Sequence, residues 1–300
     1  MMKQSNVTDF SGPMVALITP FKKNGEIDYK SFNENIVRLM NNRATGVIVA
    51  GCTGEFWSLT FEEKKELFKN AKEITNNKCN LICGCSAITL KEVLENVRLV
   101  EEIQGDACLI LPSYFVQLTE DEIFNYYEII NNSTSLPIVV YNIPQFAYNE
   151  ITPSLMKRLK NLKNVKYLKE SCGRWNNFLS LLKFSDDKIK VFCGPSSVYG
   201  FDAVKNGTIG TMDCFANVWL PGAIDLFYES LTNHENAQLL QDKGKLLTKL
   251  FTSQGRTLYP STKAAMNILG YNGGYVREPL LDLDQDNVKT IEIGLKELMI

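Results

Sequence analysis

Short apolar runs alternate along the chain with longer amphipathic stretches. Each run has the length and composition of a buried β-strand, and each stretch between two runs has the apolar spacing of a helix. The runs are Met14–Ile18, Val47–Ala50, Leu81–Gly84, Ala107–Leu111, Pro137–Tyr141, Val165–Lys169, Ile189–Cys193 and Ile209–Met212. Eight strand–helix units in succession predict an α/β fold, namely a (β/α)8 TIM barrel with a parallel sheet.

Residues that favour helix starts precede the amphipathic stretches. They are Asp28, Thr60 with Glu63, Thr89, Thr119 with Glu122, and Pro153 in a first helical turn. After Met212 only helical segments follow, at 221–231, 236–252, 261–269 and 287–298. We therefore expect a barrel over residues 1–220 and a C-terminal helical extension over residues 221–300, packed on the barrel.

A doubly wound parallel sheet is the alternative that the pattern leaves open. Such sheets often carry a GxGxxG turn after the first strand for a dinucleotide. Here the first run leads into Thr19-Pro20-Phe21 instead, which favours the barrel.

Composition and charge narrow the classes of function. The chain has 300 residues, 45% hydrophobic and 22% charged, as is ordinary for a globular protein. Because 32 basic and 34 acidic residues nearly cancel, neither nucleic acid nor a membrane surface is expected as a partner. No apolar run approaches about 18 residues, and residues 1–10 lack the features of a secretory signal, so we expect a cytoplasmic protein.

Cysteine and histidine usage limits the chemistry. The eight cysteines stand singly apart from one C-G-C, so they match neither a zinc site nor a disulfide framework and are expected to be reduced and mostly buried. The single histidine, His234, lies in the polar stretch NHENAQ and is expected at the surface. Proton transfer therefore falls to Tyr, Lys, Asp, Glu, Cys or water.

Lys169 is the leading candidate for chemistry, because barrel enzymes place their sites after the carboxyl ends of strands. Val165 and Tyr167 share its face of the strand, which leads the amine into an apolar barrel mouth. Burial lowers the pKa of a lysine and leaves part of it as a free amine that attacks carbonyls. A solvated lysine at a strand end is the alternative.

Three other strand ends carry candidate groups. Tyr141 ends the run PIVV, where its phenol either packs with a satisfied hydroxyl or relays protons to a nearby amine. Tyr114 lies in a loop, where a surface or interface position is the alternative. The stretch Gly51–Glu55 (GCTGE) allows backbone N–H groups to turn toward a carboxylate or phosphate. Glu55 itself fits a structural carboxylate better than a base.

Taken together, these residues resemble the pyruvate-dependent class I aldolases of the dihydrodipicolinate synthase and N-acetylneuraminate lyase family. The resemblance runs from Phe10 to about residue 220, and a family-like helical tail follows. The motifs occur in order and at barrel spacing: ALITPF at 16–21, GCTGE at 51–55, the Tyr114 loop, YNIP at 141–144, LKES at 168–171 and the Gly194 turn.

The resemblance implies a role for each matching residue. Lys169 would form a Schiff base with the keto carbon of pyruvate or another 2-oxo acid, and Tyr141 would shuttle protons. Tyr114 would enter the active site of a neighbouring subunit in a homotetramer, a dimer of dimers. Because the imine is itself the electron sink, no cofactor and no metal are expected. The substrate-binding residues would be Cys52, Thr53, Ser171, Gly194 and Cys214.

Three departures from the family pattern bear on the substrate. Position 52 usually carries Thr or Ser, and Cys52 is a weaker donor in the proton relay. Lysine-biosynthetic members usually have an arginine after YNxP that grips a second carboxylate, whereas Gln145–Ala147 stands here. Sialic acid lyases usually carry an acidic pair after the Gly194 turn, where this chain has Ser196 and Ser197.

We therefore expect a carbon–carbon or carbon–oxygen lyase of the aldolase type, acting on pyruvate and an aldehyde. The missing arginine places an N-acetylneuraminate lyase-like or sugar-acid aldolase first, and Phe56, Trp57 and Phe146 indicate a less polar aldehyde. The alternatives are 4-hydroxy-tetrahydrodipicolinate (dihydrodipicolinate) synthase and a 2-oxo-3-deoxy acid dehydratase. A non-enzymatic 2-oxo acid sensor is favoured by Cys52 but opposed by the retention of Lys169 and Tyr141.

Overall fold

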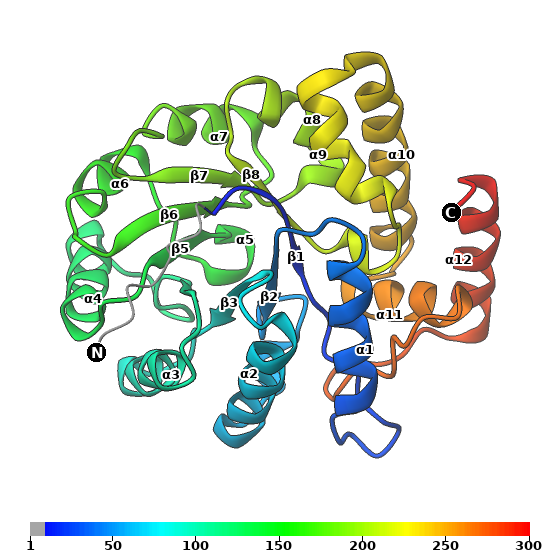
Figure 1. The fold of residues 1–300 in the computed structure, drawn as a ribbon, viewed down its shortest axis with the longest axis horizontal. Coiled ribbons are helices and arrows are strands. Elements are labelled where there is room, and N and C mark those ends of the chain that lie inside the picture. Colours follow the sequence, from blue (N-terminus) through cyan, green and yellow to red (C-terminus); the bar gives the residue numbers. More distant parts are fainter. Residues whose placement is uncertain (1–9) are drawn as a thin grey trace.

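Eight parallel strands form a closed barrel in chain order (Figure 1), in a computed structural model that describes residues 10–300. The prediction of a (β/α)8 barrel is confirmed, whereas the expectation about a secretory signal falls largely on residues 1–9, outside the described range. The strands are β1 (Gly12–Ala16), β2 (Gly46–Val49), β3 (Asn80–Gly84), β4 (Ala107–Ile110), β5 (Ile138–Asn142), β6 (Val165–Glu170), β7 (Lys190–Cys193) and β8 (Gly210–Asp213).

Helices follow the strands and surround the barrel (Figure 1). Thr60, Thr89 and Thr119 each cap the start of a helix with a capping box. For Thr60 and Thr119, the glutamate three residues later predicted this motif. The helices and 3-10 turns are α1 (Tyr29–Met40), η1 (Phe56–Ser58), α2 (Phe61–Thr75), α3 (Leu90–Glu102), α4 (Glu120–Ser133), α5 (Pro144–Ala147), α6 (Pro153–Leu159), α7 (Trp175–Leu182), α8 (Ser196–Lys205), η2 (Phe215–Asn217), α9 (Gly222–Thr232), α10 (His234–Thr252), α11 (Leu258–Ile268) and α12 (Gln285–Glu297).

The barrel closes where β1 pairs with β8, and this closure shifts β1 from its predicted position. Gly12 lies opposite Gly210, so β1 begins two residues before Met14, the first apolar residue of the predicted run. A Cβ atom on Gly210 would lie 2.2 Å from the Gly12 carbonyl oxygen. Glycine thus permits the close approach of the two strands, and a residue without a side chain gives no apolar strand signal.

The strands are buried on both faces, as expected for a parallel sheet covered by helices. In β6, for example, Lys166 is exposed and the other five residues are buried. Fully burying one aliphatic side chain stabilises a fold by about 1.5–3 kcal/mol, so this core holds the carboxyl ends of the strands in place. Polar residues at those ends therefore occupy a rigid frame.

The C-terminal helices gather on one side of the barrel, beside α1 and α8 (Figure 1). Helix α10 packs on α8 and α9, while α9 also contacts β1 and η2. Helix α11 contacts η2 and α12. The predicted helical segments are all present, with boundaries shifted by at most three residues. Helices α9, α10 and α11 contact elements of the barrel, and α12 packs on α10 and α11.

Thiols and the histidine lie where the sequence placed them. All eight cysteines are free and buried, and His234 is exposed at the start of α10. None of the helices in residues 10–300 is long and apolar enough to cross a membrane.

Candidate active site

Lys169 and Tyr141 lie side by side at the carboxyl ends of β6 and β5. The two residues are register partners on these neighbouring strands, so their side chains share one face of the sheet. Each is only 4% exposed, and the Lys169 Nζ lies 4.3 Å from the centre of the Tyr141 ring. Lys169 is therefore a buried amine against an aromatic wall, and the alternative of a solvated lysine is wrong.

The environment of Lys169 favours the neutral amine. Burial lowers the pKa of Lys169, and the smaller opposing effects come from Cys52, Cys214 and Asp213. A lower pKa leaves a larger fraction of the amine unprotonated at a given pH, and only that form attacks a carbonyl carbon.

The Tyr141 hydroxyl is engaged with side chains from two other strand ends. It is hydrogen-bonded to the Cys52 thiol, after β2, and to the Ser171 hydroxyl, after β6. Burial raises the pKa of Tyr141, so the phenol stays protonated near neutral pH and is available as a donor. Cys52 is thus in contact with the tyrosine, at the position where a relay partner was expected.

The other expected substrate-binding residues surround this pair. Thr53 is buried and its side chain is hydrogen-bonded to the Cys214 thiol, which joins the loops after β2 and β8. At Gly194, a Cβ atom would lie 1.7 Å from the Ser171 hydroxyl oxygen, so only glycine fits there. Cys52, Thr53, Ser171, Gly194 and Cys214 therefore line one end of the barrel with Lys169 and Tyr141.

Glu55 is a structural carboxylate, as the sequence indicated. It is fully buried and has a left-handed backbone with φ +53°. One of its oxygens pairs with the Lys263 ammonium at 2.5 Å, and the other accepts the Arg277 backbone N–H at 3.0 Å. Burial lowers the pKa of Lys263 to about 8, so the lysine still carries its charge at neutral pH. The ion pair ties the loop after β2 to α11.

Removing Lys263 is expected to destabilise the protein strongly. Lys263→Met leaves the buried Glu55 carboxylate without its counter-charge, which costs about 3–5 kcal/mol of unfolding free energy. Lys296→Met, in the exposed pair with Glu292, is the control and should leave the free energy of unfolding almost unchanged, because solvent screens that pair. Urea unfolding measures both variants, and equal losses would contradict the structural role of the buried pair.

Tyr114 packs at the same end of the barrel. Its ring meets Phe56 edge-on with centroids 6.2 Å apart, and its pKa is raised to about 12, mainly by burial and in part by the nearby Glu92 and Cys52. The residue that follows, Phe115, is 89% exposed. The loop after β4 thus carries the half-buried Tyr114 phenol near Cys52 and, next to it, the exposed Phe115 ring.

Tyr259 also reaches the site, and sequence analysis missed it. It lies in α11, its ring packs against Trp57 with centroids 5.2 Å apart, and its electrostatic neighbours include Cys52 and Cys214. Burial raises its pKa. No strand end marks Tyr259 in the sequence, because the residue comes from the helical extension rather than from a barrel loop.

The two serines after the Gly194 turn are already occupied by contacts within the protein. Ser196 donates its hydroxyl to Asp213 at 2.7 Å, and the Ser197 backbone N–H donates to the same carboxylate oxygen at 2.8 Å. The Ser197 hydroxyl accepts a hydrogen bond from Thr248 in α10 at 3.0 Å. Both serines are buried. They join the start of α8 to β8 and α10.

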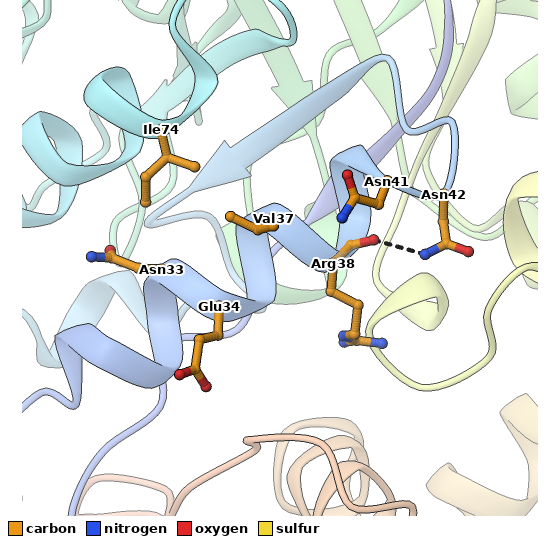
Figure 2. Close-up of a pocket in the computed structure, with 7 residues that line it drawn as sticks. All are labelled: Asn33, Glu34, Val37, Arg38, Asn41, Asn42 and Ile74. Carbon is orange, nitrogen blue, oxygen red and sulfur yellow. Dashed lines mark hydrogen bonds between the residues drawn. The ribbon is translucent and has the colours of Figure 1, made fainter.

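A surface hollow of about 540 Å³ lies apart from these residues, between α1 and α2 (Figure 2). Val37 and Ile74 face each other across it, and Arg38 is bound elsewhere, to the Asn217 carbonyl at 2.7 Å and over the Tyr271 ring. Its lining includes none of the candidate catalytic residues.

Among residues 10–300, no group of three or more His, Cys, Asp or Glu is arranged to hold a metal ion.

Comparisons with known proteins converge on one family. The model described as the dihydrodipicolinate synthetase family matches residues 9–298. The 4-hydroxy-tetrahydrodipicolinate synthase of Clostridium novyi (strain NT) is 29% identical over 293 residues, 97% of each chain. That of Ehrlichia canis (strain Jake) is 29% identical over 292 residues, 96% of this chain and 97% of its own. The crystal structure of dihydrodipicolinate synthase from Thermotoga maritima superposes with a TM-score of 0.89 at 26% identity, covering 97% and 99% of the two chains.

Proposed function

The chain belongs to the dihydrodipicolinate synthetase family, and from this premise we propose that Lys169 forms an imine with pyruvate and joins it to an aldehyde. Membership makes the chain an enzyme of the class I aldolase type. The observation that carries the proposal is the buried Lys169 amine beside the Tyr141 phenol. A sensor without turnover would not need this pair.

The proposed reaction begins when the neutral Lys169 amine attacks the keto carbon of pyruvate. Water leaves as the imine forms, with Tyr141 delivering and receiving the protons. Loss of a methyl proton gives an enamine, whose carbon attacks the aldehyde; hydrolysis of the new imine then frees the product and the lysine. Thr53 and nearby backbone N–H groups hold the pyruvate carboxylate. The iminium stabilises the carbanion, so the proposed chemistry uses no cofactor and no metal.

For the aldehyde, we propose aspartate semialdehyde and thus a 4-hydroxy-tetrahydrodipicolinate synthase. The similar proteins bear this name, which supports the alternative reading of the sequence over the sugar-acid lyase placed first. Engagement of Ser196 and Ser197 by Asp213 and Thr248 argues the same way, because these hydroxyls are not free for a sugar. The lyase remains the second candidate, since no arginine occupies residues 145–147.

Trapping the imine tests this function. The protein is incubated with pyruvate, reduced with borohydride and digested, and an adduct on Lys169 is expected by peptide mass spectrometry. Aspartate semialdehyde and N-acetylmannosamine are then compared as acceptors. An unmodified Lys169 would overturn the Schiff-base assignment, and preference for N-acetylmannosamine would favour the sugar-acid lyase.

Cys52→Thr is expected to raise turnover. Cys52 is hydrogen-bonded to the Tyr141 phenol. Because a hydroxyl donates a stronger hydrogen bond than a thiol, threonine at position 52 should improve proton transfer with Tyr141. Steady-state kinetics with pyruvate and the identified aldehyde measure the change. Cys52→Ala is the control and should lower the rate; a threonine variant no faster than wild type would show that the thiol does not limit the relay.

We further propose a cytoplasmic homotetramer, a dimer of dimers, in which the loop that carries Tyr114 and Phe115 lies at a subunit interface. The Tyr114 ring itself packs against Phe56 and lies near Cys52 of its own subunit, so the expectation that it enters a neighbouring subunit's site is not carried over.

Support for the assembly comes from exposed apolar side chains, namely Phe115 and Val116 after β4, Phe146 in α5 and Tyr148 at its end. The eight free thiols suit a reducing compartment. Sedimentation equilibrium of wild type and Phe115→Glu tests the assembly: wild type should give the tetramer mass and the variant a smaller one, while a monomeric wild type would refute it.

A further inference from the structure

A buried carboxylate stands directly behind the proposed reacting pair. Glu170 follows Lys169 in β6, so its side chain projects to the opposite face of the strand. It is fully buried. One carboxylate oxygen accepts the Asn142 side-chain N–H at 2.5 Å, and the other accepts the Cys172 backbone N–H at 2.6 Å. Its contacts thus join β5 to β6 from outside the barrel interior.

This hydrogen bond lies one register position beyond the reacting residues. Tyr141 pairs with Lys169 in the sheet, and Asn142 pairs with Glu170. The Asn142 side-chain oxygen in turn accepts the Ile151 backbone N–H at 2.9 Å, which fixes the amide's orientation. The side chains of Asn142 and Glu170 therefore reinforce the sheet where the phenol and the amine leave it.

We propose that the Glu170–Asn142 hydrogen bond is a clamp that holds the Tyr141 phenol and the Lys169 amine at proton-transfer distance. This inference rests on the proposed function. Proton transfer needs heavy atoms about 2.6–3.2 Å apart, and a misplacement of about 1 Å costs about 100-fold in rate. Glu170 touches neither substrate nor the reacting atoms, so it is a positioning residue.

The clamp needs one carboxylate and one amide in a defined arrangement. Glu170 faces the Asn142 amide on one oxygen and the Cys172 backbone N–H on the other, with the Cys172 thiol also in contact, and a carboxylate accepts on both oxygens. A glutamine accepts on one oxygen only and turns its own NH₂ toward a donor on the other side. An aspartate at position 142 would place two carboxylates against each other. Each single exchange therefore breaks the clamp. The double exchange restores all three hydrogen bonds, and only the bond between the side chains of residues 142 and 170 is reversed in direction.

The test compares Glu170→Gln, Asn142→Asp and the double variant. The readout is the exchange of pyruvate methyl protons for deuterium by NMR, which needs no aldehyde and reports on imine formation and proton transfer. Each single variant should lose about 100-fold in the limiting exchange rate with little change in the half-saturating pyruvate concentration. The double variant should regain at least about 10-fold, because coupled neighbours are not additive.

A control at the other end of β6 separates positioning from general loosening. Asn131 accepts the backbone N–H of Asn164, the residue before β6, at 2.8 Å. Asn131→Ala should lower the thermal midpoint but leave the exchange rate near wild type. Asn142→Ala removes the clamp from the β5 side, should also lose about 100-fold, and replaces any single variant that does not fold.

The outcomes decide between the two inferences. A double variant as slow as the single variants, or an Asn131→Ala variant equally slow, overturns the clamp. If borohydride traps pyruvate on Lys169 of the wild-type protein and every variant exchanges protons at the wild-type rate, the clamp is overturned and the proposed function is not. Wild type that neither exchanges nor is trapped overturns the proposed function and the clamp with it.

Discussion

Lys169→Ala is expected to abolish imine formation and to lower turnover by about 10⁴-fold or more, because no other group replaces the nucleophile. The fold should persist, since the substitution removes a buried amine whose charged form is disfavoured by desolvation. Borohydride trapping, turnover with the aldehyde and thermal unfolding measure the three effects. In wild type, the rate of imine formation should increase with pH, with a midpoint below pH 10.5, the ordinary pKa of lysine. The midpoint is lower because burial lowers the pKa of Lys169.

Lys169→Arg is the matched control. Arginine keeps a positive charge at this position but does not deprotonate, so it tests nucleophilicity rather than charge. It should be as inactive as the alanine variant. Retention of more than about a tenth of wild-type turnover by either variant would show that Lys169 is not the covalent nucleophile.

Tyr141→Phe should lower turnover by about 10²–10⁴-fold, the usual contribution of a positioned acid or base. The ring that packs against Lys169 remains and only the hydroxyl bonded to Cys52 and Ser171 is lost. Steady-state kinetics measure the rate, and borohydride should still trap the imine, though more slowly. A trapping rate equal to wild type together with normal turnover would remove Tyr141 from the proton path.

Tyr127→Phe controls for the loss of a buried tyrosine hydroxyl. Tyr127 is fully buried and donates to the Ile110 carbonyl at 2.9 Å. Its replacement should cost about 1 kcal/mol of stability with turnover near wild type. Equal activity losses at Tyr127 and Tyr141 would mean that packing, rather than proton transfer, accounts for the effect.

Local pattern was sufficient for the barrel and for the position of Lys169 and Tyr141 at the ends of neighbouring strands. Apolar runs marked every strand because parallel strands buried on both faces are apolar throughout, and alternation placed Lys169 on the face of Val165 and Tyr167. Threonine with a glutamate three residues later marked helix starts for the same local reason. The start of β1 was misplaced because Gly12 pairs with β8 without contributing an apolar side chain.

The missed features depend on contacts between distant parts of the chain. Glu55 meets Lys263 across 208 residues, and Tyr259 reaches the thiols from α11. Ser196 was interpreted through what the family usually carries at that position, whereas its partner Asp213 lies on the next strand. Periodicity and spacing describe one element at a time, so they do not indicate which side chains meet across elements.

The pairing of Glu55 with Lys263 sets an order of events during synthesis. The loop after β2 is made early, but the cation that neutralises its buried carboxylate is made 208 residues later. We expect the carboxylate to stay hydrated in a nascent chain until α11 has been made and docks. The neighbouring stretch around Thr53, which we propose holds pyruvate, should reach its final shape only then, after the last barrel strand, β8, has been made.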